Sequence, residues 1–323
     1  HDVNFPVHVE NSKHPVTRGL KDFEIYDETY KGSVFRPDNK VLLTTDEETS
    51  DEDICQVREY CKARVWYIRH GKGKEGYENG SYHIDFEDFE RKAKEAKLFL
   101  LCSPHNPTGR VWSRKEMEKI IDICIENDVL IIADEIHADI VYTKVHHSIG
   151  SFEKMMHHCV ILNAPSKTFN VAGLNTSYAI IPDSRLRQEY TLEQNRSGIT
   201  NGNPFGIEAL ISAYHEGAPW LEKLKEHLLS NITYVNTFLQ EQHIPINAVP
   251  TEATFLMWLD CKGLGLSHDQ LVKFFVHKAR LGLNDGKSFG DAGEGFMRLN
   301  VGTSKEVVKE AMQRLLHAYK AEH

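Results

Sequence analysis

The chain has 323 residues, of which 41% are hydrophobic and 26% charged, and its formal net charge is −9. This length is enough for one large domain or, as we expect, two unequal domains that share a cleft. The negative charge argues against a general nucleic-acid binder, which usually shows a basic face, and no apolar run is long enough to span a bilayer.

The six cysteines include no Cys-x-x-Cys pair, and Cys102, Cys124 and Cys159 each sit inside an apolar run. This is typical of buried thiols in a reducing compartment. The first residues show no signal-peptide pattern. We therefore expect a cytoplasmic protein.

The first ninety residues carry few structural signals. Val41-Leu42-Leu43 is the one segment that suggests a strand, and the acidic run at 46–53 predicts a solvated loop or a helix start.

Strand and helix signals alternate from residue 98 onward. Short apolar runs predict strands at 98–102, 129–133, 159–162 and 177–181. Between the first two, Ser113 and Glu116 can form a capping box for a helix with one broad apolar face. Wholly apolar strands that alternate with helices are typical of a parallel sheet covered on both faces. We therefore predict an α/β fold with a mostly parallel sheet.

The pattern changes after residue 203. Long helices are predicted at 205–216 and 219–242, followed by a strand, a helix, a strand and a helix at 254–260, 268–279, 296–301 and 304–321. This order predicts a smaller C-terminal α+β domain beside the large one.

Four polar side chains fall at or just after the ends of predicted strands: Asn106, Asp134, His137 and Lys167. Ligands of open α/β sheets bind outside the carboxyl ends of the strands. Each residue alone has an ordinary explanation, because an Asp after a strand is often a helix cap and a Lys in a polar loop is usually solvated. Together they fit pyridoxal phosphate, which needs a lysine for a Schiff base and a carboxylate for its ring nitrogen.

At these residues the chain resembles the fold-type I pyridoxal-phosphate enzymes, the aspartate aminotransferase superfamily. The motifs are Asn106-Pro107-Thr108-Gly109, Asp134–Asp139 and Ser166-Lys167. The resemblance is closer to the MalY/PatB-type cystathionine β-lyase branch, since aminotransferases usually have Tyr where His137 stands. The segments similar to that branch are 103–112, 134–139, 165–173, 217–221, 253–260 and 295–300.

The resemblance implies a role for each of these residues. Lys167 would carry pyridoxal 5'-phosphate and remove the substrate α-proton. Asp134 would pair with the pyridinium nitrogen, Asn106 would donate to the ring oxygen with His137 nearby, and Ser166 would contact the phosphate.

The resemblance also implies a substrate and an assembly. Arg298 would bind the substrate α-carboxylate with its two-pronged guanidinium. The reaction would be β-elimination from a cysteine S-conjugate such as cystathionine, which yields a thiol, pyruvate and ammonia. The protein would be a homodimer, because the active sites of the family lie between subunits.

The N-terminal part departs from the family pattern. Segments 4–7 and 25–30 resemble the N-terminal segment of the family, but 36–42 resembles a stretch that normally lies several tens of residues further on. Asp22-Phe23 stands where the family commonly has Gly-Tyr, and no stacking aromatic residue is evident near 44–46. We expect an N-terminal segment at 1–35 that packs with the small domain or a partner subunit, a cofactor-binding large domain at 36–220 shortened near 35–45, and a small α+β domain at 221–323.

Two alternatives remain open at this point. An aminotransferase of the same fold would use Lys167, Asp134 and Arg298 equally well. A non-catalytic homologue would explain why the strand and helix start that bind the cofactor phosphate in the family, and that would precede 36–42, have no counterpart in this sequence. A metal cluster of His137, Asp139, His146 and His147 is not expected, because the residues lack the spacing of known ligand sets.

Overall fold

The computed structural model describes residues 2–10, 12–13, 21–28, 40–44, 53–57, 65–67, 77–78, 80–198 and 202–322. The chain forms two compact units, residues 1–63 and residues 64–323. The boundaries that the sequence suggested, after residues 35 and 220, stay predictions.

The first unit contains an antiparallel sheet in the order β2-β1-β3-β4. Its strands are β1 (Asp2–Val9), β2 (Phe23–Glu28), β3 (Lys40–Thr44) and β4 (Asp53–Val57). The sequence reasoning indicated only β3. It missed β1, although apolar Val3, Phe5, Val7 and Val9 alternate with other residues along that strand. Most of the acidic run at 46–53 lies outside the described residues. Asp22 holds the end of β1, since its carboxylate accepts a hydrogen bond from the Val9 amide at 3.0 Å.

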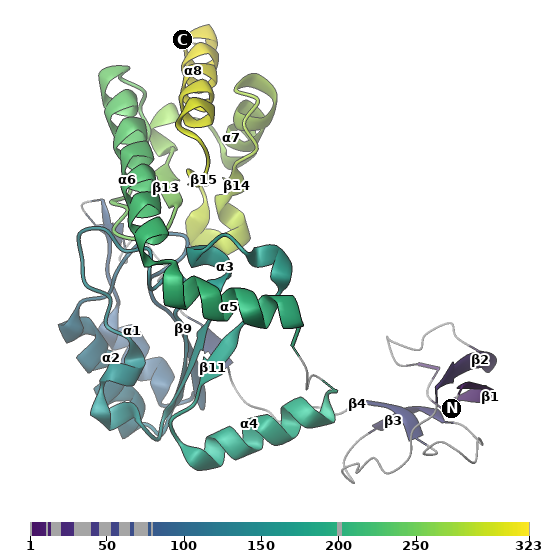
Figure 1. The fold of residues 1–323 in the computed structure, drawn as a ribbon. Coiled ribbons are helices and arrows are strands. Elements are labelled where there is room, and N and C mark those ends of the chain that lie inside the picture. The colour runs from purple at the N-terminus through teal and green to yellow at the C-terminus, as the bar shows by residue number, and fades with distance from the viewer. Residues whose placement is uncertain are drawn as a thin grey trace. The chain divides into compact units, whose positions relative to one another are not determined.

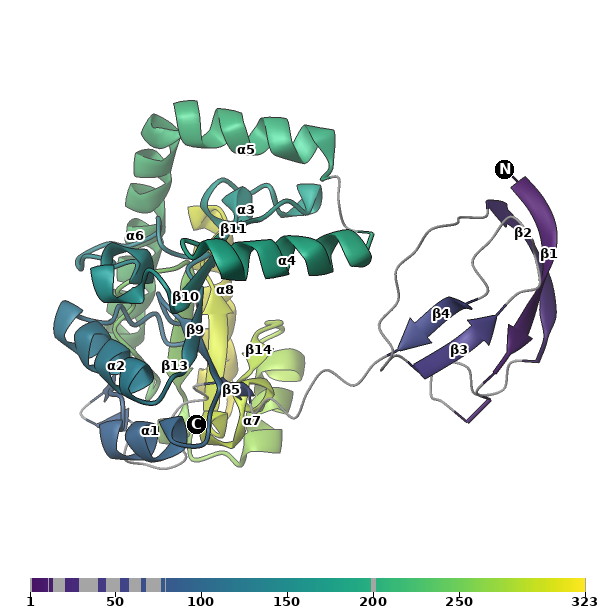
Figure 2. The ribbon, with the colours of Figure 1, turned by 90° about the horizontal axis from the view of Figure 1, so that it is seen from below.

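The second unit is built on a five-stranded sheet in the order β11-β10-β9-β8-β5 (Figures 1 and 2). Its strands are β5 (Val65–Tyr67), β8 (Leu98–Cys102), β9 (Leu130–Asp134), β10 (Cys159–Asn163) and β11 (Tyr178–Ile180). Strands β5, β8, β9 and β10 are parallel, and β11 pairs antiparallel with β10 at the edge. The predicted α/β fold with a mostly parallel sheet is confirmed.

One face of this sheet is fully buried. Helices α1 (Phe86–Ala93) and α2 (Arg114–Glu126) belong to its core, and α2 begins with the predicted capping box of Ser113 and Glu116. The buried strand residues of this face are Phe99, Leu101, Ile131, Ala133, Cys159 and Ile161. The alternate positions are only half-buried, and Leu162 is 38% exposed. Because side chains alternate along a strand, Asp134 lies on this second, more open face.

Helices α3 (Pro165–Thr168), α4 (Ser184–Arg196), α5 (Pro204–Glu216) and α6 (Ala218–Glu241) follow. The sequence predicted α5 and α6 but not α4, which buries no residue and therefore carries no apolar stripe. A short hairpin of β6 (Tyr77–Glu78) and β7 (Ser81–Tyr82) precedes α1. Within the described residues, no helix is long and apolar enough to cross a membrane.

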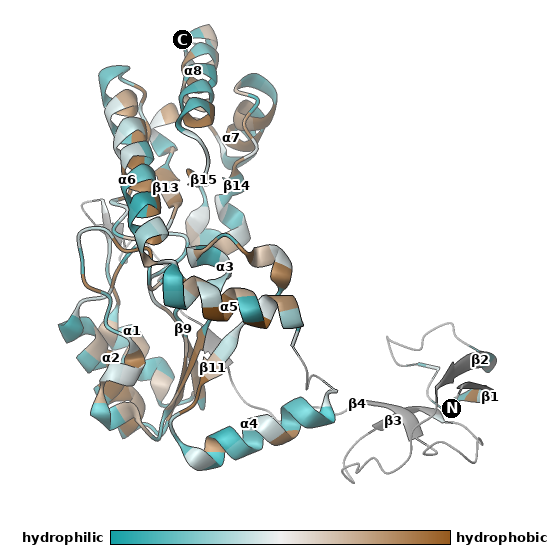
Figure 3. Ribbon diagram, viewed as in Figure 1, coloured by the Kyte–Doolittle hydropathy of each residue, from teal (hydrophilic) through white to brown (hydrophobic). Residues whose placement is uncertain are grey.

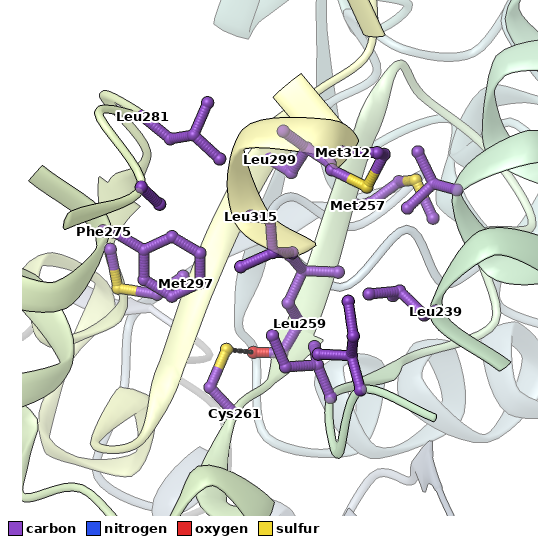
Figure 4. Packing of buried hydrophobic residues seen from close by; sticks show 14 of the residues in the cluster. Leu239, Met257, Leu259, Cys261, Phe275, Leu281, Met297, Leu299, Met312 and Leu315 are labelled. Carbon is purple, nitrogen blue, oxygen red and sulfur yellow. Dashed lines mark hydrogen bonds between the residues drawn. The ribbon is translucent and has the colours of Figure 1, made fainter. Parts of the chain in front are cut away.

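The C-terminal part is the predicted α+β unit. Its antiparallel sheet, in the order β12-β13-β15-β14, contains β12 (Asn247–Ala248), β13 (Leu256–Asp260), β14 (Asn284–Asp285) and β15 (Phe296–Asn300). Helix α7 (His268–Lys273) continues as a π-helical turn at Phe274–Lys278, and α8 (Lys305–Glu322) contacts α6. Figure 4 shows the apolar core between them, which joins Met257 and Leu259 of β13, Met297 and Leu299 of β15, and Met312 and Leu315 of α8.

The buried face of the parallel sheet should dominate stability. Ile131 has no exposed surface, so Ile131→Ala should lower the free energy of unfolding by about 2–5 kcal/mol through lost contacts and a cavity. Val307→Ala on α8 removes a side chain that is 51% exposed and should change it by no more than about 0.5 kcal/mol. Urea unfolding followed by circular dichroism measures both. Equal effects would contradict this assignment of the core.

Candidate active site

Three neighbouring parallel strands, β8, β9 and β10, place the predicted residues at the edge of the sheet where their carboxyl ends meet. Asp134 is the last residue of β9 and pairs in register with Cys102 of β8 and Leu162 of β10. Asn106 lies four residues after β8, and Lys167 lies four residues after β10. Since the carboxyl ends of parallel strands meet at one edge, the sheet itself brings these groups together.

Lys167 is an exposed lysine in the short helix α3. Within the part of the chain that the structure describes, its amine makes no hydrogen bond or ion pair. Its charge nevertheless acts on Asp134: burial raises the pKa of this carboxyl, although the side chain still reaches solvent, while a hydrogen bond from the Ile136 amide and the charge of Lys167 oppose the rise. Lys167 is therefore an uncommitted amine close to a carboxylate.

His137 is buried, with 3% of its surface exposed. Its ring contacts Phe255 edge to face, with centroids 5.6 Å apart. Burial, together with the charges of Lys167 and Arg298, lowers the pKa of His137 to about 4. Its Nδ1 has no hydrogen-bond partner among the described residues. The site thus contains a neutral imidazole with one free nitrogen, which is costly to bury without a partner.

Arg298 enters the site from β15. Its Nη1 donates to Oδ1 of Asn106 at 2.7 Å, and its Nη2 donates to Oδ1 of Asn284 at 2.9 Å. The guanidinium also lies over the ring of Phe289, 4.6 Å from its centroid. Burial lowers the pKa of Arg298, but the guanidinium has no carboxylate partner among the described residues. Its positive charge therefore remains available for an anionic ligand.

The Asn106 amide is oriented by the same contact. Because its oxygen accepts from Arg298, its nitrogen remains free to donate to another group. Asn284 was missed by the sequence reasoning. It lies in a two-residue strand with no motif around it, and only the pairing of β14 with β15 places it opposite Arg298.

A cavity of about 320 Å³ adjoins this cluster. Ser166 and Lys167 form part of its wall, and contact of Ser166 with a phosphate stays a prediction. The other lining residues are Asn170, Ala172, Trp220, Leu224, His227, Leu228, Phe255, Asn300, Gly302 and Thr303. Most of the α6 residues among them could not be found from sequence, because at helical spacing they look like an ordinary apolar face.

The unfavourable burial of His137 predicts a pH dependence of stability. The unfolded chain protonates this ring near pH 6.5 and the folded chain only near pH 4. The unfolded state therefore binds more protons between these values, so stability is lost as the pH falls from 7 to 4. The contribution of this ring is about 3 kcal/mol.

His137→Gln should reduce the difference in unfolding free energy between pH 7 and pH 4.5, as measured by urea titration. His215→Gln, which removes an exposed histidine on α5, should leave that difference as it is in the parent chain. An unchanged pH profile in His137→Gln would show that the ring does not contribute.

Comparison with known proteins places this site in a family. Residues 64–315 match the family model described as aminotransferase class I and II. Residues 1–83 match a different model, described as trehalose utilisation. The first match begins where the second compact unit begins, and the two matches overlap only at 64–83.

Individual relatives agree with the larger match. The chain is 37% identical over 241 residues to cystathionine beta-lyase PatB of Bacillus subtilis, covering 73% of this chain and 62% of that protein. It is 33% identical over 228 residues to protein MalY of Escherichia coli, covering 70% and 58%.

Among solved structures, cystalysin from Treponema denticola, which contains a pyridoxal 5'-phosphate cofactor, superposes with a TM-score of 0.72 at 34% identity, covering 76% of this chain and 64% of that one. The chain thus spans about 60% of the length of these relatives. With a family model matched over most of its length and this cluster at the matching strand ends, the chain belongs to the aminotransferase class I and II family.

Proposed function

We propose that this protein is a pyridoxal-phosphate-dependent carbon–sulfur lyase that cleaves cysteine S-conjugates such as cystathionine. The observation that carries the proposal is the uncommitted amine of Lys167 beside Asp134, with Arg298 held across the site by neutral amides. The similarity to PatB and to cystalysin supports it. The activity of the whole protein remains a proposal, because the chain spans only part of the length of these relatives.

The residues present fit the cofactor at its ring end. A lysine that binds an aldehyde must be free of ion pairs, as Lys167 is among the described residues, and a carboxylate must lie close by, as Asp134 does. The unpartnered Nδ1 of His137 and the free Asn106 amide nitrogen offer polar atoms to the same space. At the phosphate end, Ser166 is the residue that we assign, and it lines the adjoining cavity.

When bound, pyridoxal phosphate supplies an electron sink that stabilises negative charge on the α-carbon of an amino acid. Arg298 would hold the α-carboxylate of the substrate, and its fixed fork would set the orientation of the α-carbon. Nζ of Lys167 would accept the α-proton, and Asp134 would keep a proton on the ring nitrogen. The bond between the β-carbon and sulfur would then break, and the sulfur would leave with a proton as the thiol. Water would hydrolyse the remaining three-carbon fragment to pyruvate and ammonia.

The comparisons also favour a second candidate. Residues 1–63 lie outside the aminotransferase match, and residues 1–83 match a model of another description. A chain in which that unit replaces the family's N-terminal part could be a homologue that has lost cofactor binding. An aminotransferase activity is a variant of the first proposal, since it would use the same Lys167, Asp134 and Arg298.

We also propose that the protein is a homodimer. Helix α5 exposes several apolar side chains. Its ribbon carries brown, hydrophobic segments in Figure 3, whereas that of α4 is mostly teal. Phe205 is 80% exposed, Ile207 45% and Ile211 54%. Ile207 and Ile211 are four residues apart and share one face of the helix. Exposed apolar side chains that gather on one face commonly mark a protein interface.

The first test is cofactor binding at Lys167. Purified protein mixed with pyridoxal phosphate should develop visible absorbance, and borohydride should fix the cofactor on the peptide that contains Lys167, as found by mass spectrometry. Lys167→Ala should abolish both signals, since no other amine lies beside Asp134 in the described residues. Lys223→Ala, an exposed lysine on α6, should keep them. If the parent chain gives no band, the lyase proposal fails and the non-catalytic alternative is favoured.

The second test separates the two reactions. A lyase should release pyruvate and thiol from cystathionine without an added keto acid, whereas an aminotransferase requires one. Arg298→Lys should lower kcat/KM about 10- to 100-fold, because a bidentate charged contact becomes a single one. Arg185→Lys on α4, whose side chain is 86% exposed, serves as the matched control. Turnover that depends entirely on keto acid would overturn the assignment as a lyase.

A further inference from the structure

Helix α3 carries Lys167 but has little intrinsic stability. It comprises only Pro165–Thr168, and its N-cap, Ala164, supplies no side-chain hydrogen bond. A single helical turn is marginal by itself, because nucleation costs more than one hydrogen bond returns. The position of the Lys167 amine must therefore be fixed by tertiary contacts of its neighbours.

The strongest of these contacts is made by Thr168. This residue has no exposed surface, and its hydroxyl donates a hydrogen bond to Oδ2 of Asp139 at 2.8 Å. The bond is part-buried, and a hydrogen bond to a carboxylate is among the stronger ones in a protein. Asp139 lies in the loop that follows Asp134. This bond therefore connects helix α3, the turn that carries Lys167 and is called the lysine turn below, to the segment that carries the site carboxylate.

That loop is itself firmly anchored. Glu135, next to Asp134, is 3% exposed and accepts hydrogen bonds from the Ile149 amide at 2.8 Å and from His146 at 3.2 Å. Backbone bonds from Ala138 to Glu135 and from Ile140 to His137 close the turn that leads to Asp139. Asp139 is thus a fixed point from which Thr168 can be held.

The other side of the lysine turn packs on aromatic residues. Phe169 contacts Tyr214 edge to face at 5.3 Å and Trp220 at 6.0 Å between ring centroids. Gly217 makes room for it, because a Cβ there would collide with the Phe169 ring. Ring packing is not directional, so the Thr168 bond is the contact that can set the rotation of the turn. Asp139 also acts on the hydroxyl of Tyr214, so the same carboxylate influences both sides of the turn.

We propose that Asp139 is a positioning residue that, through the Thr168 hydroxyl, holds the Lys167 amine in place relative to Asp134. The proposal rests on the proposed function in one respect only: a misplaced amine is expected to weaken the binding of the cofactor. Asp139 does not itself contact the reacting atoms.

Four variants test the proposal. Thr168→Val and Asp139→Ala remove the bond, and Thr168→Ser keeps the hydroxyl. Thr191→Val is the matched control, because its hydroxyl bonds a backbone carbonyl, that of Arg187, on exposed α4. Hydrogen exchange of the amides at 166–170 is measured first, on the full chain without added cofactor. We expect exchange at least about ten-fold faster in Thr168→Val and Asp139→Ala, and parent rates in Thr168→Ser and Thr191→Val.

The second readout is the Kd for pyridoxal phosphate, measured at a temperature where circular dichroism shows every variant folded. The Kd should rise about ten-fold in Thr168→Val and Asp139→Ala. The double variant should show no rise beyond that of Asp139→Ala, because the Thr168 hydroxyl has already lost its partner there. Thr168→Ser should restore the parent value. A merely structural role would lower the melting temperature without this pattern in Kd.

The outcomes separate this proposal from the proposed function. Unchanged exchange rates in Thr168→Val and Asp139→Ala would show that the bond between Thr168 and Asp139 does not hold the lysine turn, whether or not the protein binds the cofactor. Faster exchange with an unchanged Kd overturns the positioning role. If the parent chain binds no pyridoxal phosphate, the proposed function fails, while the exchange rates still decide whether Asp139 holds the lysine turn.

Discussion

The parallel pairing of β8, β9 and β10 is the constraint on which the rest of the site depends. Because the strands run in one direction and pair in register, the segments that follow them leave from the same edge of the sheet. Asn106, Asp134 and Lys167 are separated by about thirty residues in sequence, and only this register makes them neighbours. The buried face beneath, packed by α1 and α2, resists any slip, since a shift of one residue would turn apolar side chains to the open face.

The charges of the site contrast with those of a structural arginine nearby. Arg110 is paired with Glu116 at 2.8 Å and Glu252 at 3.3 Å, so its charge is neutralised within the protein. Arg298 is held only by the neutral oxygens of Asn106 and Asn284 in the described residues. A guanidinium held without a counter-ion is costly to the fold but suits a carboxylate ligand. The two arginines therefore serve different purposes, although each stands in a segment that resembles the family.

The N-terminal unit marks the limit of the family likeness. The aminotransferase match begins at residue 64, and the sheet of the first unit has antiparallel strands of its own. From the sequence, we interpret this region as a shortened version of the family's N-terminal part in which the phosphate-binding segment is missing. The ring end of the proposed cofactor site depends on residues 106–298, and its phosphate end rests on Ser166 in the described part of the chain.

The sequence by itself determined the α/β class and most of the longer elements after residue 98, and it supplied the candidate site residues, whose roles stay predictions. It could do so because apolar periodicity and strand-end motifs are local signals that survive without tertiary context. Among the elements that it missed, α4 buries no residue and so gives no apolar signal, whereas β1 does carry an alternating pattern at Val3, Phe5, Val7 and Val9 that the reasoning overlooked. Only the tertiary structure decided that Asn284 and Asn106 hold Arg298, that His137 is buried and neutral, and that Asp139 reaches Thr168. Those contacts join residues far apart in the chain, and long-range packing rather than local pattern sets their geometry and burial.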